Sequence, residues 1–263
     1  MIIDSHAHIY PEKIAVKASD NVGNFYGIPM AYDGTLEHLL EEGTKAGVDK
    51  FLVHSVATKP AQVSSINQFI AESVAAHPDR LIGFCTMHPD SENKEAEFQW
   101  AMEHGLKGVK LHPDFQEFYI DDDKAKEIYA LAEGVCPIVF HMGDYRTEFS
   151  KAERLVHIMK EFPNLDCIAA HFGGYSEWAT GAAYLATERC YVDTSSSTFQ
   201  LEPYQVRQLV DIYGADRVLF GTDYPMWDAT EEMARLLKAG FTKEEKEKMF
   251  HLNLERLLAK YEK

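Results

Sequence analysis

The chain alternates short apolar segments with longer amphipathic segments eight times, and this alternation constrains its fold more than any other feature. Each apolar segment is rich in β-branched or aromatic residues, which is typical of a buried strand. Each following segment carries its apolar residues at helical spacing. The predicted strands cover residues 2–6, 50–55, 81–87, 108–112, 137–141, 167–171, 190–193 and 218–222. The predicted helices cover residues 35–46, 61–77, 92–103, 123–133, 152–162, 176–186, 203–213 and 230–238.

Eight strand-then-helix units in 263 residues favour an α/β fold of the (β/α)8 TIM-barrel type. A doubly wound sheet would usually have fewer strands and two open edges. No Gly/Ser/Pro-rich linker divides the sequence, so we expect residues 1–263 to form a single domain. A C-terminal helix is predicted over residues 242–261, opened by the capping sequence Thr242-Lys243-Glu244-Glu245. Residues 11–33 contain several glycines and are predicted to form an irregular first βα loop above the barrel.

The charge balance excludes some partners. The chain has 26 Lys and Arg against 42 Asp and Glu, a formal net charge of −16, which disfavours nucleic acid and anionic membranes. No apolar run approaches the length of a membrane span, and the start of the chain lacks an export signal, so we expect a cytoplasmic protein. The four scattered cysteines are predicted to be reduced core residues.

Polar side chains of the kind that bind metals end one predicted strand after another. Active sites of barrels gather at the C-terminal ends of the strands, so these side chains are predicted to meet there. They are His6 and His8 after the first strand, Lys110 and His112 on the fourth, His141 on the fifth, His171 on the sixth and Asp223 on the eighth.

The spacing of His6 and His8 puts both imidazoles on one face of a strand, since residues two apart point the same way. Alone, the pair is equally compatible with ordinary hydrogen-bonded histidines. With His141 and Asp223 it supplies three nitrogens and one carboxylate oxygen and leaves room for water. We therefore predict one divalent metal, zinc first, with Mn²⁺ or a second metal as alternatives. Asp223 and His171 are the predicted catalytic residues: Asp223 takes or orients the proton of the water, and His171 lies beside it or polarises the substrate.

Together these residues resemble the amidohydrolase superfamily, whose pattern is His-x-His on strand one, histidines on strands five and six, and Asp on strand eight. The segments GTDYP around Asp223 and HFGG around His171 are similar to the amidohydrolase-related branch that includes aminocarboxymuconate semialdehyde decarboxylase. The closing segment KEKMFHLNLERLL, with Asn253, also resembles that branch. The resemblance implies a metal-dependent enzyme acting on a small organic, carboxylate-bearing substrate, and a homodimer, because dimers are common in that family.

The resemblance leaves the reaction open. The main expectation is hydrolysis of a C–N or C–O bond by metal-activated water, and the alternative is non-oxidative decarboxylation at the same site. A third possibility is a metal-binding barrel without catalysis, which the complete ligand set disfavours. A TatD-type nuclease ranks last, because Lys110 stands where those enzymes carry a glutamate and because of the net charge of −16.

Several further residues have predicted roles at the pocket. In binuclear members of the superfamily a strand-four lysine is carboxylated and bridges two metals, so Lys110 is either such a bridge or a buried lysine that is hydrogen-bonded or anchors the substrate. His112 and Trp227 are predicted to line the pocket, with a structural role as the alternative for His112. Arg146 either binds a substrate carboxylate or forms a surface ion pair. Asp4 either orients His6 or makes a strand-end contact. The other histidines, His54 among them, are predicted to be ordinary surface or core residues.

Overall fold

Every strand of the protein runs parallel to its neighbours, and their order in space follows their order in the sequence. The computed structural model describes residues 1–262. The strands are β1 (Ile3–His8), β2 (Lys50–His54), β3 (Leu81–Gly83), β4 (Cys85–Thr86), β5 (Val109–Leu111), β6 (Ile138–Phe140), β7 (Cys167–Ala169), β8 (Tyr191–Asp193) and β9 (Val218–Leu219). Apart from β1, which continues to His8, each lies inside a predicted strand.

Two seams complete the ring of strands. Strands β3 and β4 are separated by Phe84 alone and are therefore two halves of one barrel strand. Between β9 and β1, the backbone N–H of Ser5 donates to the carbonyl of Phe220 (2.8 Å), and that of Asp223 donates to the carbonyl of His6 (2.8 Å). The regular ladder is interrupted at both seams, but the strands follow one another around the ring. The predicted TIM-barrel fold is confirmed.

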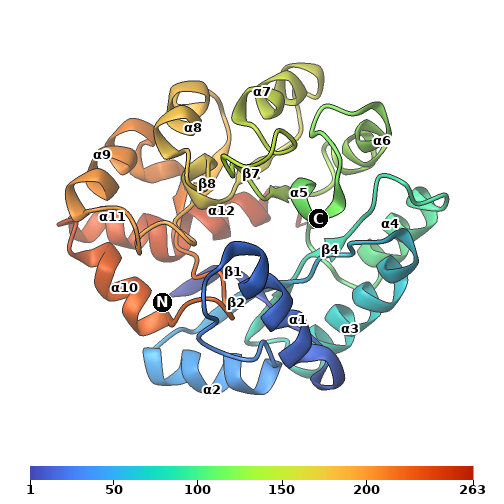
Figure 1. The fold of residues 1–263 in the computed structure, drawn as a ribbon, viewed down its shortest axis with the longest axis horizontal. Coiled ribbons are helices and arrows are strands. Elements are labelled where there is room, and N and C mark those ends of the chain that lie inside the picture. The colour runs from blue at the N-terminus through green and yellow to red at the C-terminus, as the bar shows by residue number, and fades with distance from the viewer. Residues whose placement is uncertain (263) are drawn as a thin grey trace.

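Helices surround the ring of strands (Figure 1). They are α2 (Leu36–Ala46), α3 (Val63–Ala76), α4 (Lys94–Glu103), α6 (Asp123–Ala132), α7 (Ala152–Glu161), α8 (Trp178–Leu185), α9 (Pro203–Tyr213) and α10 (Ala229–Leu237). Each overlaps one of the predicted helices. Short turns of 3₁₀ helix, η1 (Pro60–Gln62), η2 (His171–Gly173) and η3 (Ala215–Arg217), and the single turn α5 (Pro113–Gln116) complete the connections. In the part of the chain that the structure describes, no helix is long and apolar enough to cross a membrane.

One end of the barrel is filled by apolar side chains. Those of Ile3, Leu52, Phe84, Val139, Ile168 and Leu219 are buried in one cluster with Leu254 and Leu257 of α12 (Asn253–Ala259). Burial of a side chain of this size stabilises a fold by roughly 1.5–3 kcal/mol. Helix α12 lies behind the strands in Figure 1 and closes this end.

The C-terminal helix is not continuous, so the prediction of one helix over residues 242–261 is wrong in its middle. Helix α11 (Lys243–Glu247) begins at the predicted capping box of Thr242 and Glu245. A π-helical turn, η4 (Lys248–Leu252), separates it from α12. Within this turn the carbonyl of Met249 accepts a hydrogen bond from the backbone N–H of Phe220 (2.8 Å). A π-turn suits this contact because it interrupts the regular helical hydrogen bonding.

The segment after β1 forms a helix where an irregular loop was predicted. Helix α1 (Glu12–Tyr26) ends at Gly27, whose φ of 67° is left-handed. Gly23 is one of the glycines from which the irregular loop was predicted, but it lies inside this helix. It lets the backbone of Ile28 pack closely against the helix, since a Cβ there would lie 2.8 Å from the carbonyl oxygen of Ile28. Ile14 and Val16 remain more than half exposed, so the helix lacks the apolar face of one packed on a core. Helix α1 lies in front of the strands in Figure 1.

Candidate metal centre

The two histidines of β1 point at one carboxylate. Oδ1 of Asp223 lies 3.5 Å from Nε2 of His6 and 3.4 Å from Nε2 of His8. The backbone of Asp223 is left-handed (φ 70°), a conformation that costs a non-glycine residue about 1–3 kcal/mol and that often occurs at functional sites. Its other oxygen accepts a hydrogen bond from the hydroxyl of Ser196 (2.5 Å). These contacts turn Oδ1 toward the two imidazoles.

Asp193, at the end of β8, orients His6. Its Oδ2 lies 2.8 Å from Nδ1 of His6, which leaves Nε2 of that ring for another partner. Its Oδ1 accepts from the backbone N–H groups of His171 (3.0 Å) and Ser195 (3.1 Å). Burial alone would raise the pKa of this carboxyl, but His6 and its hydrogen bond hold it well below the usual range. Sequence reasoning missed Asp193, although it ends a predicted strand as the other polar residues do.

His141 and His171 continue the cluster. Nδ1 of His141 lies 2.9 Å from Nε2 of His171, and the His171 ring lies 5.2 Å from that of His6. The other nitrogen of His141 lies 3.3 Å from Oδ2 of Asp114 and 3.4 Å from the hydroxyl of Tyr26. His171 also has a left-handed backbone (φ 59°). Sequence reasoning did not assign Asp114 to the site.

Three groups of side chains bring their ligand atoms within 4.8 Å of one another and could hold a divalent ion. They are His6, His8 and His54; His6, His171 and Asp193; and His112, Asp114 and His141. The predicted ligands His6, His8, His141 and Asp223 do not all belong to one of these groups. His6 and His8 meet at Asp223, whereas His141 contacts His171, which in turn neighbours His6.

Burial keeps the imidazoles neutral. It lowers the pKa of His6 to about 4, helped by the positive charge of Lys110, and it also lowers the pKa values of His8, His141 and His171. Burial raises the pKa of Asp223, but His6 and the hydrogen bond from His8 outweigh that effect and hold it well below the usual range. Neutral imidazoles beside an ionised carboxylate are a donor set that fits zinc or manganese.

Lys110 lies beneath this cluster. Its Nζ is fully buried and 3.1 Å from Nε2 of His6. Burial lowers the pKa of the amine to about 8, against the attraction of Asp223 and Asp193. Lys110 is absent from the wall of the cavity above, so its position does not support the substrate-anchor prediction, whereas its contact with His6 agrees with the alternative of a buried, hydrogen-bonded lysine. The carboxylated bridge stays a prediction.

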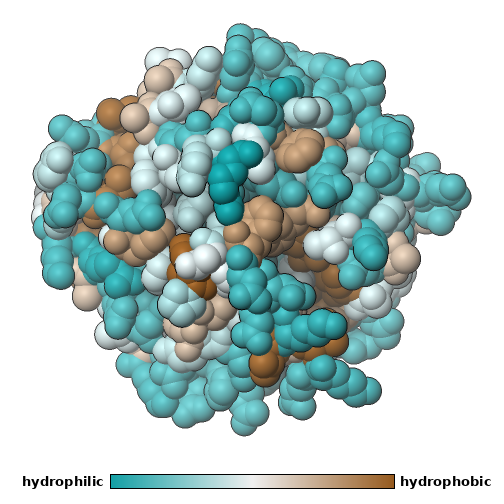
Figure 2. Space-filling model, viewed as in Figure 1, coloured by the Kyte–Doolittle hydropathy of each residue, from teal (hydrophilic) through white to brown (hydrophobic). Residues whose placement is uncertain are grey.

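A cavity of about 730 Å³ opens above the cluster. Its polar lining includes His8, His112, Asp114, His141, His171 and Asp223 of the cluster, together with Lys17 and Glu117. Its apolar walls include Ile14, Phe25 and Tyr26 of α1, and Val56, Ile66, Phe69 and Phe115 opposite them. Figure 2 shows hydrophobic side chains gathered where this face of the molecule is hollowed, with hydrophilic ones around them. The cavity can enclose a small, largely apolar molecule and present one end of it to the polar cluster.

Comparison with known proteins decides the family. The family model described as amidohydrolase matches residues 3–260. The chain belongs to the amidohydrolase family. Among solved structures, this amidohydrolase is similar to an uncharacterised TIM-barrel protein from Bordetella bronchiseptica, with 22% identity, a TM-score of 0.80 and coverage of 99% of each chain.

Two other similar structures are decarboxylases. A dihydroxybenzoic acid decarboxylase from Polaromonas, with bound manganese and the inhibitor 2-nitroresorcinol, is 16% identical, with a TM-score of 0.76 and coverage of 100% of this chain and 98% of that chain. A 5-carboxyvanillate decarboxylase from Novosphingobium aromaticivorans, complexed with manganese and a nitrobenzoic acid, is 17% identical, with a TM-score of 0.74 and coverage of 98% and 96%. These likenesses show the shared fold of this amidohydrolase.

The predicted pocket residues of the amidohydrolase differ in their placement. His112 lines the cavity, stacked between the rings of His141 and Phe115 at 3.8 Å from each. Arg146 and Trp227, in contrast, are not part of the wall that the described residues form. Arg146 binds the carboxylate of Asp144 and donates to the backbone carbonyl of Phe25 (2.7 Å), so it fastens α1 instead of facing a substrate.

Trp227 supports the site from behind. Its indole N–H donates to the hydroxyl of Ser196 (2.9 Å), the group that donates to Asp223. Asp4 does not contact the imidazole of His6. Its carboxylate accepts from the backbone N–H groups of His6 (3.1 Å) and Thr222 (3.0 Å), so it holds the seam between β1 and β9.

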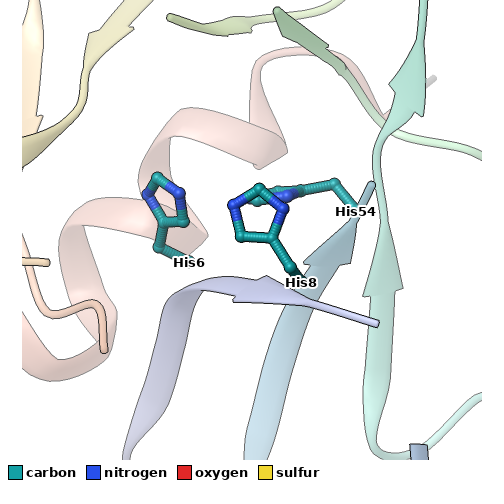
Figure 3. A group of neighbouring side chains, drawn as sticks. All are labelled: His6, His8 and His54. Carbon is teal, nitrogen blue, oxygen red and sulfur yellow. The ribbon is translucent and has the colours of Figure 1, made fainter. Parts of the chain in front are cut away.

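His54 of the amidohydrolase is not the isolated residue that the sequence suggested. It ends β2, is fully buried, and its ring lies 4.8 Å from that of His6 and 4.5 Å from that of His8 (Figure 3). Its position at the end of a predicted strand was the available signal. Sequence reasoning discounted it because no converging partner was apparent.

Proposed function

We propose that this amidohydrolase is a metal-dependent decarboxylase that releases CO₂ from a small aromatic or unsaturated carboxylic acid. The observation that carries the proposal is the pairing of an apolar, aromatic-walled cavity with a floor of imidazoles and carboxylates. Such a cavity fits a planar, conjugated body with one charged end. The two manganese-containing decarboxylases of the same fold support this choice over hydrolysis.

We assign the metal to His6, His8, His141 and Asp223. His6 offers Nε2, because Asp193 occupies its Nδ1, and His141 offers the Nδ1 that faces His171. Three imidazoles and one carboxylate are donors that suit a zinc or manganese ion, which when bound would supply a Lewis acid that draws electron density from the oxygens of the substrate. Asp114 fixes the orientation of His141 from the opposite side of its ring.

The side chains of the protein would transfer one proton during the reaction. In the reaction a proton adds to the carbon that bears the carboxylate, the C–C bond breaks, its electron pair restores the conjugation of the substrate, and CO₂ leaves. Asp223 lines the cavity as a carboxylate, so we assign it to receive this proton from water or a substrate hydroxyl and to deliver it to carbon. His171, beside it, orients the reacting end of the substrate.

Lys17 supports a negatively charged substrate. It lies on α1 and is the one Lys or Arg that the structure, over residues 1–262, places in the cavity wall. The same wall also holds the carboxylates of Asp114, Glu117 and Asp223, so the ammonium of Lys17 is the group there that can attract an anion. We propose that Lys17 pairs with a carboxylate or another anionic substituent at the outer end of the substrate.

A second candidate function is hydrolysis of a C–N or C–O bond. The contact of the ionised Asp223 with His8 favours it, since this carboxylate is equally placed to accept a proton from water. Water would then add across the bond, its hydroxyl to the carbonyl carbon and its proton to the leaving nitrogen or oxygen. The two functions need the same side chains and differ in the bond that breaks.

Product analysis separates them. Protein loaded with Zn²⁺ or Mn²⁺ is incubated with hydroxybenzoates and unsaturated carboxylic acids, and CO₂ is measured; lactones, esters and amides are tested in parallel. We expect CO₂ release that Asp223→Asn abolishes. Hydrolysis without CO₂ release would favour the second function. Full metal occupancy without either activity across the panel would favour a binding protein.

A further inference from the structure

His54 has no hydrogen-bond partner although it is fully buried. Neither its Nδ1 nor its Nε2 contacts a donor or an acceptor, and within residues 1–262 it is the one buried side chain left in this state. A buried polar group without a hydrogen-bond partner destabilises the folded state. A phenylalanine would fill similar space without that cost, so the nitrogens of His54 need an explanation other than packing.

The barrel aims this imidazole at the two histidines of β1. In the ladder between β1 and β2, His54 is paired with His8, so their side chains leave adjacent strands at the same level. The ring planes of His54 and His8 are 84° apart, and those of His54 and His6 are 77° apart, so the rings meet edge to face and are not stacked. Figure 3 shows the His54 ring extending from β2 behind that of His8 and toward that of His6.

The ligand atoms of the three rings are close enough to share one ion. Those of His6, His8 and His54 all lie within 4.8 Å of one another. His54 is absent from the cavity wall, so its nitrogens are not placed to contact a substrate there.

We propose that His54 is a further nitrogen ligand of the metal centre, supplied by the second strand of the barrel. This inference rests on the proposed function, because His6 and His8 belong to both sets. A bound ion would occupy one nitrogen of His54 and thereby remove part of the unsatisfied polarity described above. The additional imidazole shifts the donor set further toward nitrogen, which suits zinc better than magnesium or calcium.

Two variants of His54 separate ligation from packing. His54→Phe keeps an aromatic ring and removes the two nitrogens. His54→Ala removes the ring together with its nitrogens. His88→Phe is the matched control, because His88 is also buried but its Nδ1 already accepts from the backbone N–H of Asp90 (3.1 Å). Zn²⁺ affinity is measured by competition with a chromophoric chelator, and the visible spectrum of the Co²⁺-loaded protein reports the ligands.

We expect both His54 variants to bind Zn²⁺ at least 10-fold more weakly than wild type and to change the Co²⁺ spectrum, while His88→Phe does neither. X-ray absorption of the Zn²⁺-loaded wild-type protein, which needs no variant, should count one imidazole more than His6, His8 and His141 supply. Wild-type affinity and an unchanged spectrum in His54→Phe would overturn the inference. If His8→Ala also kept its metal, the proposed centre itself would fail; loss in His8→Ala alone would reject only the role of His54.

Discussion

Nδ1 of His6 lies 2.8 Å from Oδ2 of Asp193, so a carboxylate on β8 fixes a histidine on β1 across the interior of the barrel. The same carboxylate holds the backbone of His171 and Ser195. One side chain therefore positions two parts of the centre that are far apart in sequence.

Asp193→Asn tests that link. The amide keeps the shape of the side chain but loses the charge that favours an Nδ1–H donor on His6, so Nε2 becomes a poorer ligand. We expect metal affinity to fall about 10–100-fold, measured by chelator competition. Asp166→Asn is the control, because Asp166 lies outside the cluster and pairs with Lys260 near the C-terminus. Equal affinity in both variants would contradict the role of Asp193.

His8→Ala tests the metal assignment directly. His8 contacts Asp223 and lines the cavity, so its loss should remove the metal and the activity together, as judged by elemental analysis and product assay. A ligand that binds only the folded state stabilises it, so a chelator should lower the unfolding temperature of wild type and leave His8→Ala unchanged. His38→Ala, an exposed histidine on α2, serves as control. Stoichiometric metal in His8→Ala would refute the assignment.

Lys17→Met tests the substrate charge. The methionine keeps most of the apolar stem and removes the ammonium, so KM for anionic substrates should rise several-fold while kcat changes little. Lys13→Met lies on the same helix outside the cavity wall and should have no effect. A fall in kcat with KM unchanged would show that Lys17 acts in the reaction and not in binding.

Arg146→Met tests the attachment of α1. The guanidinium pairs with Asp144, donates to the carbonyl of Phe25 and lies 4.6 Å from the Phe25 ring. Since Arg146 is partly exposed, we expect its loss to weaken the docking of α1 by roughly 1 kcal/mol. Limited proteolysis within residues 12–26 should become faster, with metal content unchanged. Arg154→Met, which removes a similar ion pair with Asp121 away from α1, should leave that proteolysis unaltered.

The acid stability of the protein should depend on Glu245. Hydrogen bonds from Arg207 on α9 and from the backbone of Thr242 lower the pKa of this carboxyl to about 2, from an ordinary value of 4.5. The folded state therefore binds the proton more weakly than the unfolded state, and the stabilisation is present above pH 4.5 and lost as the pH falls toward 2.

Thermal unfolding between pH 7 and pH 2 measures this effect. Glu245→Gln should be less stable than wild type at pH 7, and the difference should shrink as the pH approaches 2. Glu247→Gln, whose long contact with Lys243 (3.7 Å) lies at the surface, should run parallel to wild type. A pH-independent difference for Glu245→Gln would mean that its charge contributes nothing.

The alternation of strand and helix patterns predicted the barrel because each pattern reflects one local rule. Period-two or fully apolar runs form strands, period-3.6 runs form helices, and their order leaves few topologies. Helix α1 was not predicted, because its apolar residues face a cavity and solvent instead of the core. The π-turn at Lys248–Leu252 was not predicted either, since a contact with Phe220 far along the chain accompanies it.

The site was predictable where its residues end strands with a familiar spacing. His6, His8, His141, His171 and Asp223 meet as the order of strands in a barrel requires. Asp193 and His54 depend on which side chains face each other across the barrel, and one sequence does not encode those distances visibly. The single domain, the homodimer and the cytoplasmic location stay predictions.

The two ends of the barrel have different roles. Leu254 and Leu257 of α12 seal the end that stabilises the fold, whereas α1 forms one wall of the other end with residues that contribute little to the core. We therefore expect Ile14, Lys17 and Asn21 to tolerate changes in size and charge while the barrel and its cluster of histidines and carboxylates persist. Substitutions on this face of α1 should therefore change which small molecules enter the cavity without changing the fold of this amidohydrolase.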